Sequence, residues 1–190
     1  MMIIKNLLLM VFLLLLSVNI KEDHISINDI MITLEKDIFM DRKELVKELV
    51  TDEGYVTEIY EDHLGYKTFG VGHLVLDSDD ECGANVGTEV SEDRILECLE
   101  KDIDAICEDL DRNIPFWRKL DEERQRVVAN MAFNLGINRL LKFERFLEAL
   151  EKRDYKKSAA EMLNSRWAKQ VGSRSERLKK RMLDGSKNFT

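Results

Sequence analysis

Apolar residues recur at helical spacing where the charged part of the chain begins. Leu45 and Leu49 lie four residues apart, so they share one face of a helix. Asp41 is suited to cap the first turn, because its side-chain oxygen can accept a hydrogen bond from an early backbone N–H. Gly54 is a natural stop. The pattern therefore predicts a helix whose last turn contains Glu53.

Between residues 55 and 75 the periodicity changes to that of β-structure. Strand-forming β-branched and aromatic residues are interrupted there by Gly65, Gly70 and Gly72. A polar stretch, "DSDDECGANVG", follows at residues 77–87. The segment predicts a small three-stranded antiparallel sheet followed by a loop.

Helical periodicity returns after this loop. Ser91 is expected to cap a long helix that reaches about Asp111, with apolar residues along one side. Beyond Pro115 the pattern is helical throughout, with breaks at Gly136 and Gly172. The expected helical segments are 121–135, 139–150, 154–163 and 174–184.

These elements predict an α+β fold with two lobes within residues 41–190. A sheet lobe covers about residues 55–90, and one connecting helix covers about 91–111. A larger all-helical lobe covers about 112–184. We expect the functional cleft between the two lobes.

The N-terminal segment is not expected to belong to this fold. Twelve apolar or small residues run from Leu7 to Val18, fewer than the roughly 20 that a bilayer span needs. We predict a signal peptide or an uncleaved membrane anchor over residues 1–20 and a spacer over 21–40. With Lys5 before the run, both alternatives place the rest of the chain outside the cytoplasm, as a secreted or extracytoplasmic protein.

Charge divides the folded part unevenly. The formal net charge of the whole chain is −8, which argues against a general nucleic-acid binder. Residues 41–111 contain 22 acidic and 6 basic side chains, whereas residues 112–190 contain 10 acidic and 20 basic ones. Besides an ordinary solvated surface, this pattern fits an acidic half that faces a basic half across a groove.

The cysteines give no metal-like or redox motif. Cys98 and Cys107 are nine residues apart in one predicted helix, on opposite faces, and cannot bridge each other. At most one disulfide is possible, and it would involve Cys82. Neither clustered His or Cys ligands nor a phosphate-binding loop is evident, so we expect no cofactor and no metal.

Two carboxyl groups stand out by their predicted positions. Glu53 ends the first helix, Asp62 lies at the turn after the first strand, and Thr68 lies on the return strand, so the three can converge at one edge of the sheet. The negative end of the helix dipole and the adjoining Asp52 disfavour charge on Glu53, whereas Asp62 at a hydrated turn should stay ionised. One protonated and one ionised carboxyl group is the division of labour that glycosidic hydrolysis needs.

The segment "DEGYVTEIYEDHLGYKTFGVGHLV" resembles the active-site segment of the bacteriophage-type lysozymes, glycoside hydrolase family 24. That family has a Glu, eight residues, an Asp, five residues, a Thr and then Gly-x-Gly-His, and the chain meets each of these spacings. Three more segments resemble the family in the same order: "NMAFNLG" at 130–136, "SRW" at 165–167 and "SRSERLKKR" at 173–181.

The resemblance implies that residues 41–190 are the catalytic domain of an N-acetylmuramidase. Such an enzyme is a bacteriolytic glycosidase that cuts the β-1,4 bond between N-acetylmuramic acid and N-acetylglucosamine in bacterial peptidoglycan. Glu53 would be the general acid, Asp62 the base or electrostatic stabiliser, and Thr68 the residue that positions the attacking water. The implied route is inversion, in which the carboxyl groups stand roughly 6.5–9.5 Å apart.

The resemblance also suggests supporting residues. His73, at the Gly-x-Gly-His position, is expected to be structural and paired to Asp102 on the long helix. Arg174 is expected to form an ion pair with Glu53, which would oppose the influence of the helix dipole.

Substrate contacts are expected from the helical lobe. Asn134 fits either a hydrogen bond to an N-acetyl group or a helix cap, and Arg166 is a candidate sugar contact. Phe133 fits either a sugar platform or the core, as does Trp167, and the core reading is the more ordinary for both.

Two other readings of the same sequence stay open. The first is a catalytically silent module of this fold that binds cell wall or chitin. The second is a membrane-anchored lysis factor that acts through its leader. We expect a monomer, and the sequence leaves open whether the setting is phage lysis or a secreted antibacterial defence.

Overall fold

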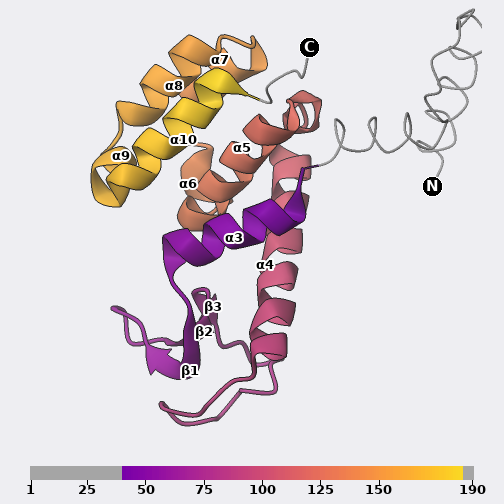
Figure 1. Ribbon diagram of the computed structural model, residues 1–190, viewed down its shortest axis with the longest axis vertical. Helices are drawn as coiled ribbons and strands as arrows, with labels where there is room; N and C mark the ends of the chain where they lie inside the picture. The colour runs from indigo at the N-terminus through magenta and orange to yellow at the C-terminus, as the bar shows by residue number, and fades with distance from the viewer. Residues whose placement is uncertain (1–39, 186–190) are drawn as a thin grey trace, which may run out of the picture. The chain divides into compact units, whose positions relative to one another are not determined.

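A computed structural model describes residues 40–185 of the protein (Figure 1). The predicted leader, and all of the predicted spacer except Met40, lie outside the described residues. Within the described range, no helix is both long enough and apolar enough to cross a membrane.

Helix α3, Arg42–Glu53, begins and ends where the sequence predicts. The Asp41 side chain accepts a hydrogen bond from the backbone N–H of Glu44 at 3.1 Å, which satisfies an otherwise unpaired donor of the first turn. Gly54 ends the helix with φ of 88°, a left-handed conformation that favours glycine. The helix end therefore fixes the position of Glu53.

The sheet follows directly from the end of α3. Strands β1 (Val56–Glu61), β2 (Lys67–Gly70) and β3 (His73–Leu74) pair antiparallel in sequence order. Their register places Tyr60 opposite Thr68, in neighbouring positions on the two strands. The β1–β2 turn is closed by the backbone hydrogen bond from Asp62 N to Tyr66 O at 2.9 Å. Asp62 and Thr68 are thus brought to the same end of the sheet.

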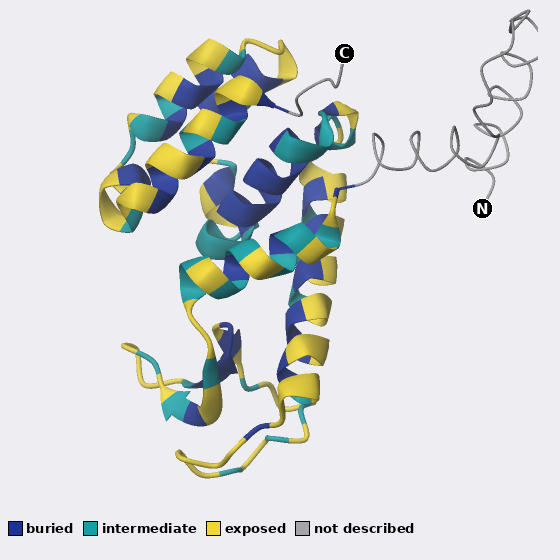
Figure 2. Cartoon of the chain, viewed as in Figure 1, coloured by how far each residue is buried: buried dark blue, intermediate teal, exposed yellow. Residues whose placement is uncertain are grey.

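Helix α4, Glu92–Asn113, connects the sheet to the helices (Figure 1). The Ser91 side chain caps it by accepting from the N–H of Arg94 at 3.3 Å. One stripe of the helix is buried along its length, as the helical spacing of its apolar residues predicts (Figure 2). A single helix thereby contributes to the cores of both lobes.

The helical lobe surrounds helix α5, most of which is buried (Figure 2). A short 3₁₀-helix, Trp117–Lys119, leads into it. The remaining helices are α5 (Glu122–Leu135), α6 (Ile137–Leu140), α7 (Glu144–Glu151), α8 (Tyr155–Leu163), α9 (Arg166–Val171) and α10 (Ser173–Asp184). The predicted α+β class, with a small antiparallel sheet and a larger helical part, is confirmed.

Two details of the helical lobe differ from the sequence prediction. The single helix expected over 139–150 is split into α6 and α7, because the chain turns at Phe143. The Phe143 ring lies edge-on to Phe146 and Trp167, at centroid distances of 6.5 and 6.2 Å, and the long-range contact with Trp167 fixes the corner. Helix α9 was not anticipated, although Ser165 caps it by accepting from Ala168 N at 3.0 Å.

The cysteines do not form a disulfide with one another. Cys82, Cys98 and Cys107 are all free thiols, and the last two are buried in α4. Burial raises the pKa of the Cys98 thiol to about 11, so it is not a nucleophile at neutral pH.

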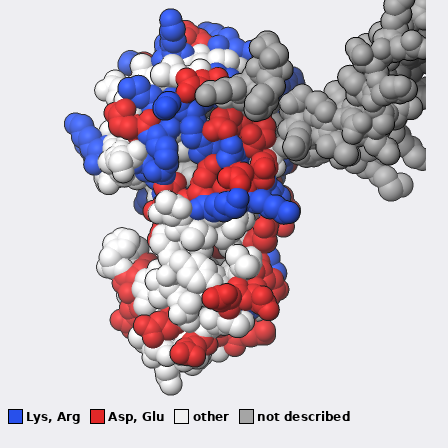
Figure 3. Space-filling model, in the orientation of Figure 1, with Lys and Arg blue, Asp and Glu red and all other residues white. Residues whose placement is uncertain are grey.

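Acidic side chains are scattered over the sheet lobe, whereas most lysines and arginines lie over the helices (Figure 3).

Candidate active site

Glu53 projects from the last turn of α3 and is held by the helical lobe. Arg174 Nη1 on α10 donates to Glu53 Oε1 at 2.7 Å, so the expected ion pair is present. Asn134 Nδ2 on α5 donates to Oε1 at 3.1 Å and, more weakly, to Oε2 at 3.4 Å. The Glu53 side chain is 21% exposed, so it is fixed in direction while remaining accessible to solvent.

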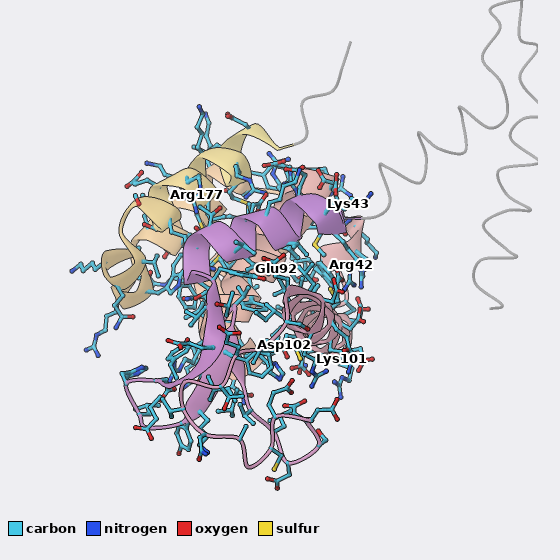
Figure 4. All side chains as sticks on the ribbon, turned by 60° about the horizontal axis from the view of Figure 1, so that its bottom comes forward. Arg42, Lys43, Glu92, Lys101, Asp102 and Arg177 are labelled. Carbon is cyan, nitrogen blue, oxygen red and sulfur yellow. The ribbon has the colours of Figure 1, made fainter. Side chains whose placement is uncertain are left out.

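The neighbouring acid, Asp52, is buried and paired with two arginines. Its side chain is 3% exposed and forms ion pairs with Arg174, at 3.2 Å, and with Arg177. It also accepts a hydrogen bond from Asn130 Nδ2 at 2.9 Å. Arg177 extends from α10 toward α3 in Figure 4. Two guanidinium groups therefore offset the repulsion between the adjacent carboxylates.

Arg174 is itself fixed by Asn130. Its Nε donates to Asn130 Oδ1 at 2.9 Å, and its Nη2 donates to the Asn130 backbone oxygen at 3.2 Å. The residue is 5% exposed. Its guanidinium thus bonds two acids and one amide in a buried network whose members come from α3, α5 and α10.

Asp62 is shaped by the turn between β1 and β2. Its Oδ1 accepts from the backbone N–H of Leu64 at 2.8 Å and of Tyr66 at 2.9 Å. The Tyr66 N–H is the main cause that lowers the pKa of Asp62 below its ordinary value of 3.8, with further help from the N–H groups of Leu64 and Gly65. Asp62 is therefore ionised at neutral pH, as the sequence predicts for a turn position.

The Tyr60 phenol lies within electrostatic range of both Glu53 and Asp62. Burial is the main cause that raises the pKa of the Tyr60 phenol, and the negative charges of Asp62 and Glu53 raise this pKa further. Both carboxylates must lie near the same ring for this to occur, because Coulomb interactions fall with distance. Glu53 is the last residue of α3 and Asp62 directly follows β1, so the strand β1 connects the two acids (Figure 1).

Thr68 lies across the strand pair from Tyr60 and is 4% exposed. Its hydroxyl donates to the Tyr66 carbonyl oxygen at 3.1 Å. The hydroxyl hydrogen is therefore used within the turn, whereas the oxygen retains lone pairs that can accept a hydrogen bond from water.

His73 is tied to the connecting helix, as expected. Its Nδ1 lies 2.8 Å from Asp102 Oδ2 on α4, and Asp102 is labelled in Figure 4. Its Nε2 lies 3.1 Å from Asp79 Oδ2, a contact that the sequence did not reveal. Asp102 is the main cause that raises the pKa of His73 above its ordinary 6.5, against the effect of burial, and Asp79 adds to this rise. A buried imidazole held between two carboxylates is a link between β3 and α4 rather than a free base.

The expected substrate contacts occupy different environments. Asn134 uses both ends of its amide within the protein, because its Oδ1 accepts from Trp167 Nε1 at 2.8 Å while its Nδ2 reaches Glu53. Phe133 is partly buried and packs against the core. Arg166 is exposed and lines a cavity of about 840 Å³ in the helical lobe, together with Trp167. Asn134 therefore orients Glu53 in this structure, a role that its spacing in the sequence did not indicate.

Comparisons with known proteins identify the family of the chain. Residues 50–184 match the family model described as phage lysozyme. The chain belongs to the phage lysozyme family. The resemblance seen in the sequence is thereby confirmed, and this lysozyme-family chain is a glycosidase of lysozyme-like fold.

Curated relatives of this lysozyme-family chain come from a cellular organism and from phages. It is 31% identical over 146 residues to probable T4-type lysozyme 1 of Dictyostelium discoideum, covering 67% of this chain and 86% of that protein. It is 30% identical over 152 residues to peptidoglycan hydrolase gp36 of Pseudomonas phage phiKMV, covering 78% of this chain and 16% of that protein. It is 26% identical over 153 residues to the pre-baseplate central spike protein Gp5 of Enterobacteria phage T4, covering 71% of this chain and 27% of that protein. The match to the two phage proteins is thus confined to a part of each.

Proposed function

We propose that this lysozyme-family chain is an endo-muramidase that hydrolyses the β-1,4 bond between N-acetylmuramic acid and N-acetylglucosamine in bacterial peptidoglycan. The family supports the reaction class, and one relative is named a peptidoglycan hydrolase. The observations that carry the proposal are that Arg174 and Asn134 hold Glu53 at the end of α3, and that the turn after β1 holds Asp62 with its charge in range of the Tyr60 phenol. Glycoside hydrolysis requires two carboxyl groups on opposite sides of one linkage.

In this proposal Glu53 is the general acid. Arg174 engages Oε1 at 2.7 Å, whereas Oε2 has only the 3.4 Å contact with Asn134. Oε2 is therefore the oxygen that carries the proton to the glycosidic oxygen as the leaving group departs. The proton comes from solvent, which reaches the partly exposed side chain before the sugar chain covers it.

Asp62 is the base on the other side of the linkage. The hydrogen bonds from Leu64 and Tyr66 both go to Oδ1, so Oδ2 is the oxygen that we assign to the water. Oδ2 accepts a proton from the attacking water, and Thr68 accepts a hydrogen bond from the same water. A water between base and sugar produces inversion at the anomeric carbon, so the first product is the α anomer.

We also propose that the enzyme works outside the cytoplasm and as a monomer. The apolar run Leu7–Val18 supports export, either as a cleaved signal or as an anchor. The acid, the base and Thr68 all come from one chain, so a second copy is not required for the reaction.

Analysis of the new reducing ends tests the bond that is cut. Purified peptidoglycan is digested, reduced with borohydride and hydrolysed, and the resulting sugar alcohols are identified. We expect muramitol, because cleavage after N-acetylmuramic acid leaves that sugar at the reducing end. The anomer formed first, followed by proton NMR on a soluble fragment, should be α.

Two outcomes would overturn the proposal. Glucosaminitol would identify a glucosaminidase, which cuts the other linkage of the same polymer. No new reducing end, together with retention of the protein on sedimented cell wall, would leave the catalytically silent binding module. The Glu53→Gln variant, digested in parallel, controls for contaminating hydrolases.

A further inference from the structure

A second group of chemically active side chains lies between the sheet and α4. It consists of His73 on β3, Asp79 in the loop that follows, and Cys98 on α4. One potential ligand atom from each residue lies within 4.8 Å of the other two. His73 Nε2 is the ring nitrogen on this side, because Nδ1 is engaged by Asp102. An imidazole nitrogen, a carboxylate oxygen and a sulfur therefore converge on one point.

The residues around this group hold it in place. Asp102 Oδ2 lies 2.8 Å from His73 Nδ1, which fixes the ring orientation and directs Nε2 toward Asp79. Arg94 Nη2 donates to Asp79 Oδ1 at 3.1 Å, and Asp79 Oδ2 accepts from the backbone N–H of Leu76 at 2.7 Å, so both bonds direct Oδ2 toward the histidine. A carboxylate on the far nitrogen of a histidine is the arrangement found around histidines that ligate metals.

We propose that His73, Asp79 and Cys98 form a binding site for one Zn²⁺ ion. Zinc accepts nitrogen, oxygen and sulfur ligands together, whereas Ca²⁺ and Mg²⁺ select oxygen. Zinc–ligand bonds of about 2.0–2.3 Å in a tetrahedron separate the ligand atoms by about 3.3–3.8 Å. Side-chain movements of about 1 Å bring atoms that now lie within 4.8 Å to these distances.

Charge balance favours a divalent ion at this place. The thiolate of Cys98 and the carboxylate of Asp79 neutralise its two positive charges. Binding replaces the thiol proton of Cys98 and the proton on Nε2 of His73, and both protons go to solvent. Next to the site, Arg94 is also paired with Glu81 and Glu97, and Asp102 adds a further negative charge, so the surroundings are net negative and favour a cation.

The burial of the ligands points to a structural ion. Cys98 is 1% exposed and His73 7%, whereas the Asp79 side chain, at 11%, is next to solvent. The ion would link β3 and its loop to α4 and so steady the sheet that carries Asp62 and Thr68.

Cobalt titration of the full-length protein tests this proposal directly. The protein is treated with EDTA, desalted under reducing conditions and titrated with Co²⁺, whose thiolate complex absorbs in the near ultraviolet. We expect a band that saturates at one Co²⁺ per chain and disappears when Zn²⁺ is added. Zn²⁺ should also raise the thermal unfolding midpoint of the EDTA-treated protein.

Matched cysteine variants decide which thiol is responsible. Cys98→Ser should lose the band, whereas Cys107→Ser, which alters the other buried thiol of α4, should keep it. Cys82→Ser should also keep it, since that thiol is exposed. Asp102→Asn should weaken binding by about 10–100-fold without removing the band at saturation.

Several results would overturn the site. They are the absence of a thiolate band in the wild-type protein, a band that persists in Cys98→Ser, and a band that is lost in Cys82→Ser. If circular dichroism shows that Cys98→Ser is unfolded, Asp79→Asn becomes the deciding variant. Unchanged affinity and an unchanged shift of the unfolding midpoint in Asp79→Asn would contradict the proposal.

Discussion

Replacing Glu53 by Gln should lower the rate of cell-wall lysis by about 10²–10⁴-fold, the range that a general acid contributes. The amide cannot deliver a proton to the glycosidic oxygen. Its oxygen can still accept the hydrogen bonds from Arg174 and Asn134, so the site should keep its geometry. The rate is measured as the loss of turbidity of a suspension of purified cell walls.

A glutamate far from the site provides the matched control. The Glu108 side chain on α4 is 75% exposed and lies 4.0 Å from Arg112. Glu108→Gln removes the same charge and should lyse walls at the wild-type rate. Equal rates for Glu53→Gln and the wild type would mean that the proton donor is another residue.

Arg174→Met should lower the free energy of unfolding by about 3–5 kcal/mol, because it leaves buried charges without their partner. Asp52 would keep only the partly exposed Arg177 and the amide of Asn130, and Glu53 would lose its ion pair. Unfolding in urea measures the change. Lysis should fall as well, because Glu53 would no longer be held in direction.

Arg177→Met separates the effect of burial from the effect of losing a charge. Arg177 pairs with the same Asp52, but its side chain is 45% exposed, compared with 6% for Arg174. Solvent-exposed pairs contribute about 0–1 kcal/mol, so this variant should stay close to wild-type stability. Similar losses of the free energy of unfolding for both variants would show that the burial of Arg174 does not make its ion pairs more stabilising than that of Arg177.

The sequence predicts most of the elements because their signals are local. Asp41 and Ser91 cap their helices as expected, and Gly54 ends the first one. The alternation between residues 55 and 75 indicates the sheet, since cross-strand neighbours are close in sequence. Local signals do not predict the turn at Phe143, because that turn depends on contact with Trp167 in a later helix.

The residues of the candidate site also fall into two groups, those that local spacing in the sequence indicates and those that only long-range contacts reveal. Spacing alone indicates Glu53, Asp62 and Thr68, which lie in one short segment. The network that holds Glu53 depends on contacts across 81 residues to Asn134 and 121 residues to Arg174. Family resemblance indicates Arg174, but it gives no sign that Asn134 bonds the acid itself.

The spacing of residues in the sequence does not predict the proposed metal site. Five residues separate His73 from Asp79, and eighteen separate Asp79 from Cys98, so no ligand motif exists in the sequence. The three residues meet only because α4 packs against β3 and the loop after it. Tertiary packing, rather than local pattern, therefore creates this group.

The crystal structure of Glu53→Gln with a bound peptidoglycan oligosaccharide tests the central claim most directly. The proposal predicts one glycosidic oxygen within hydrogen-bonding distance of the side chain at position 53, with Asp62 on the opposite face of the adjoining sugar ring. A sugar chain seated instead in the cavity lined by Arg166 and Trp167, with no linkage near either carboxyl position, would contradict it.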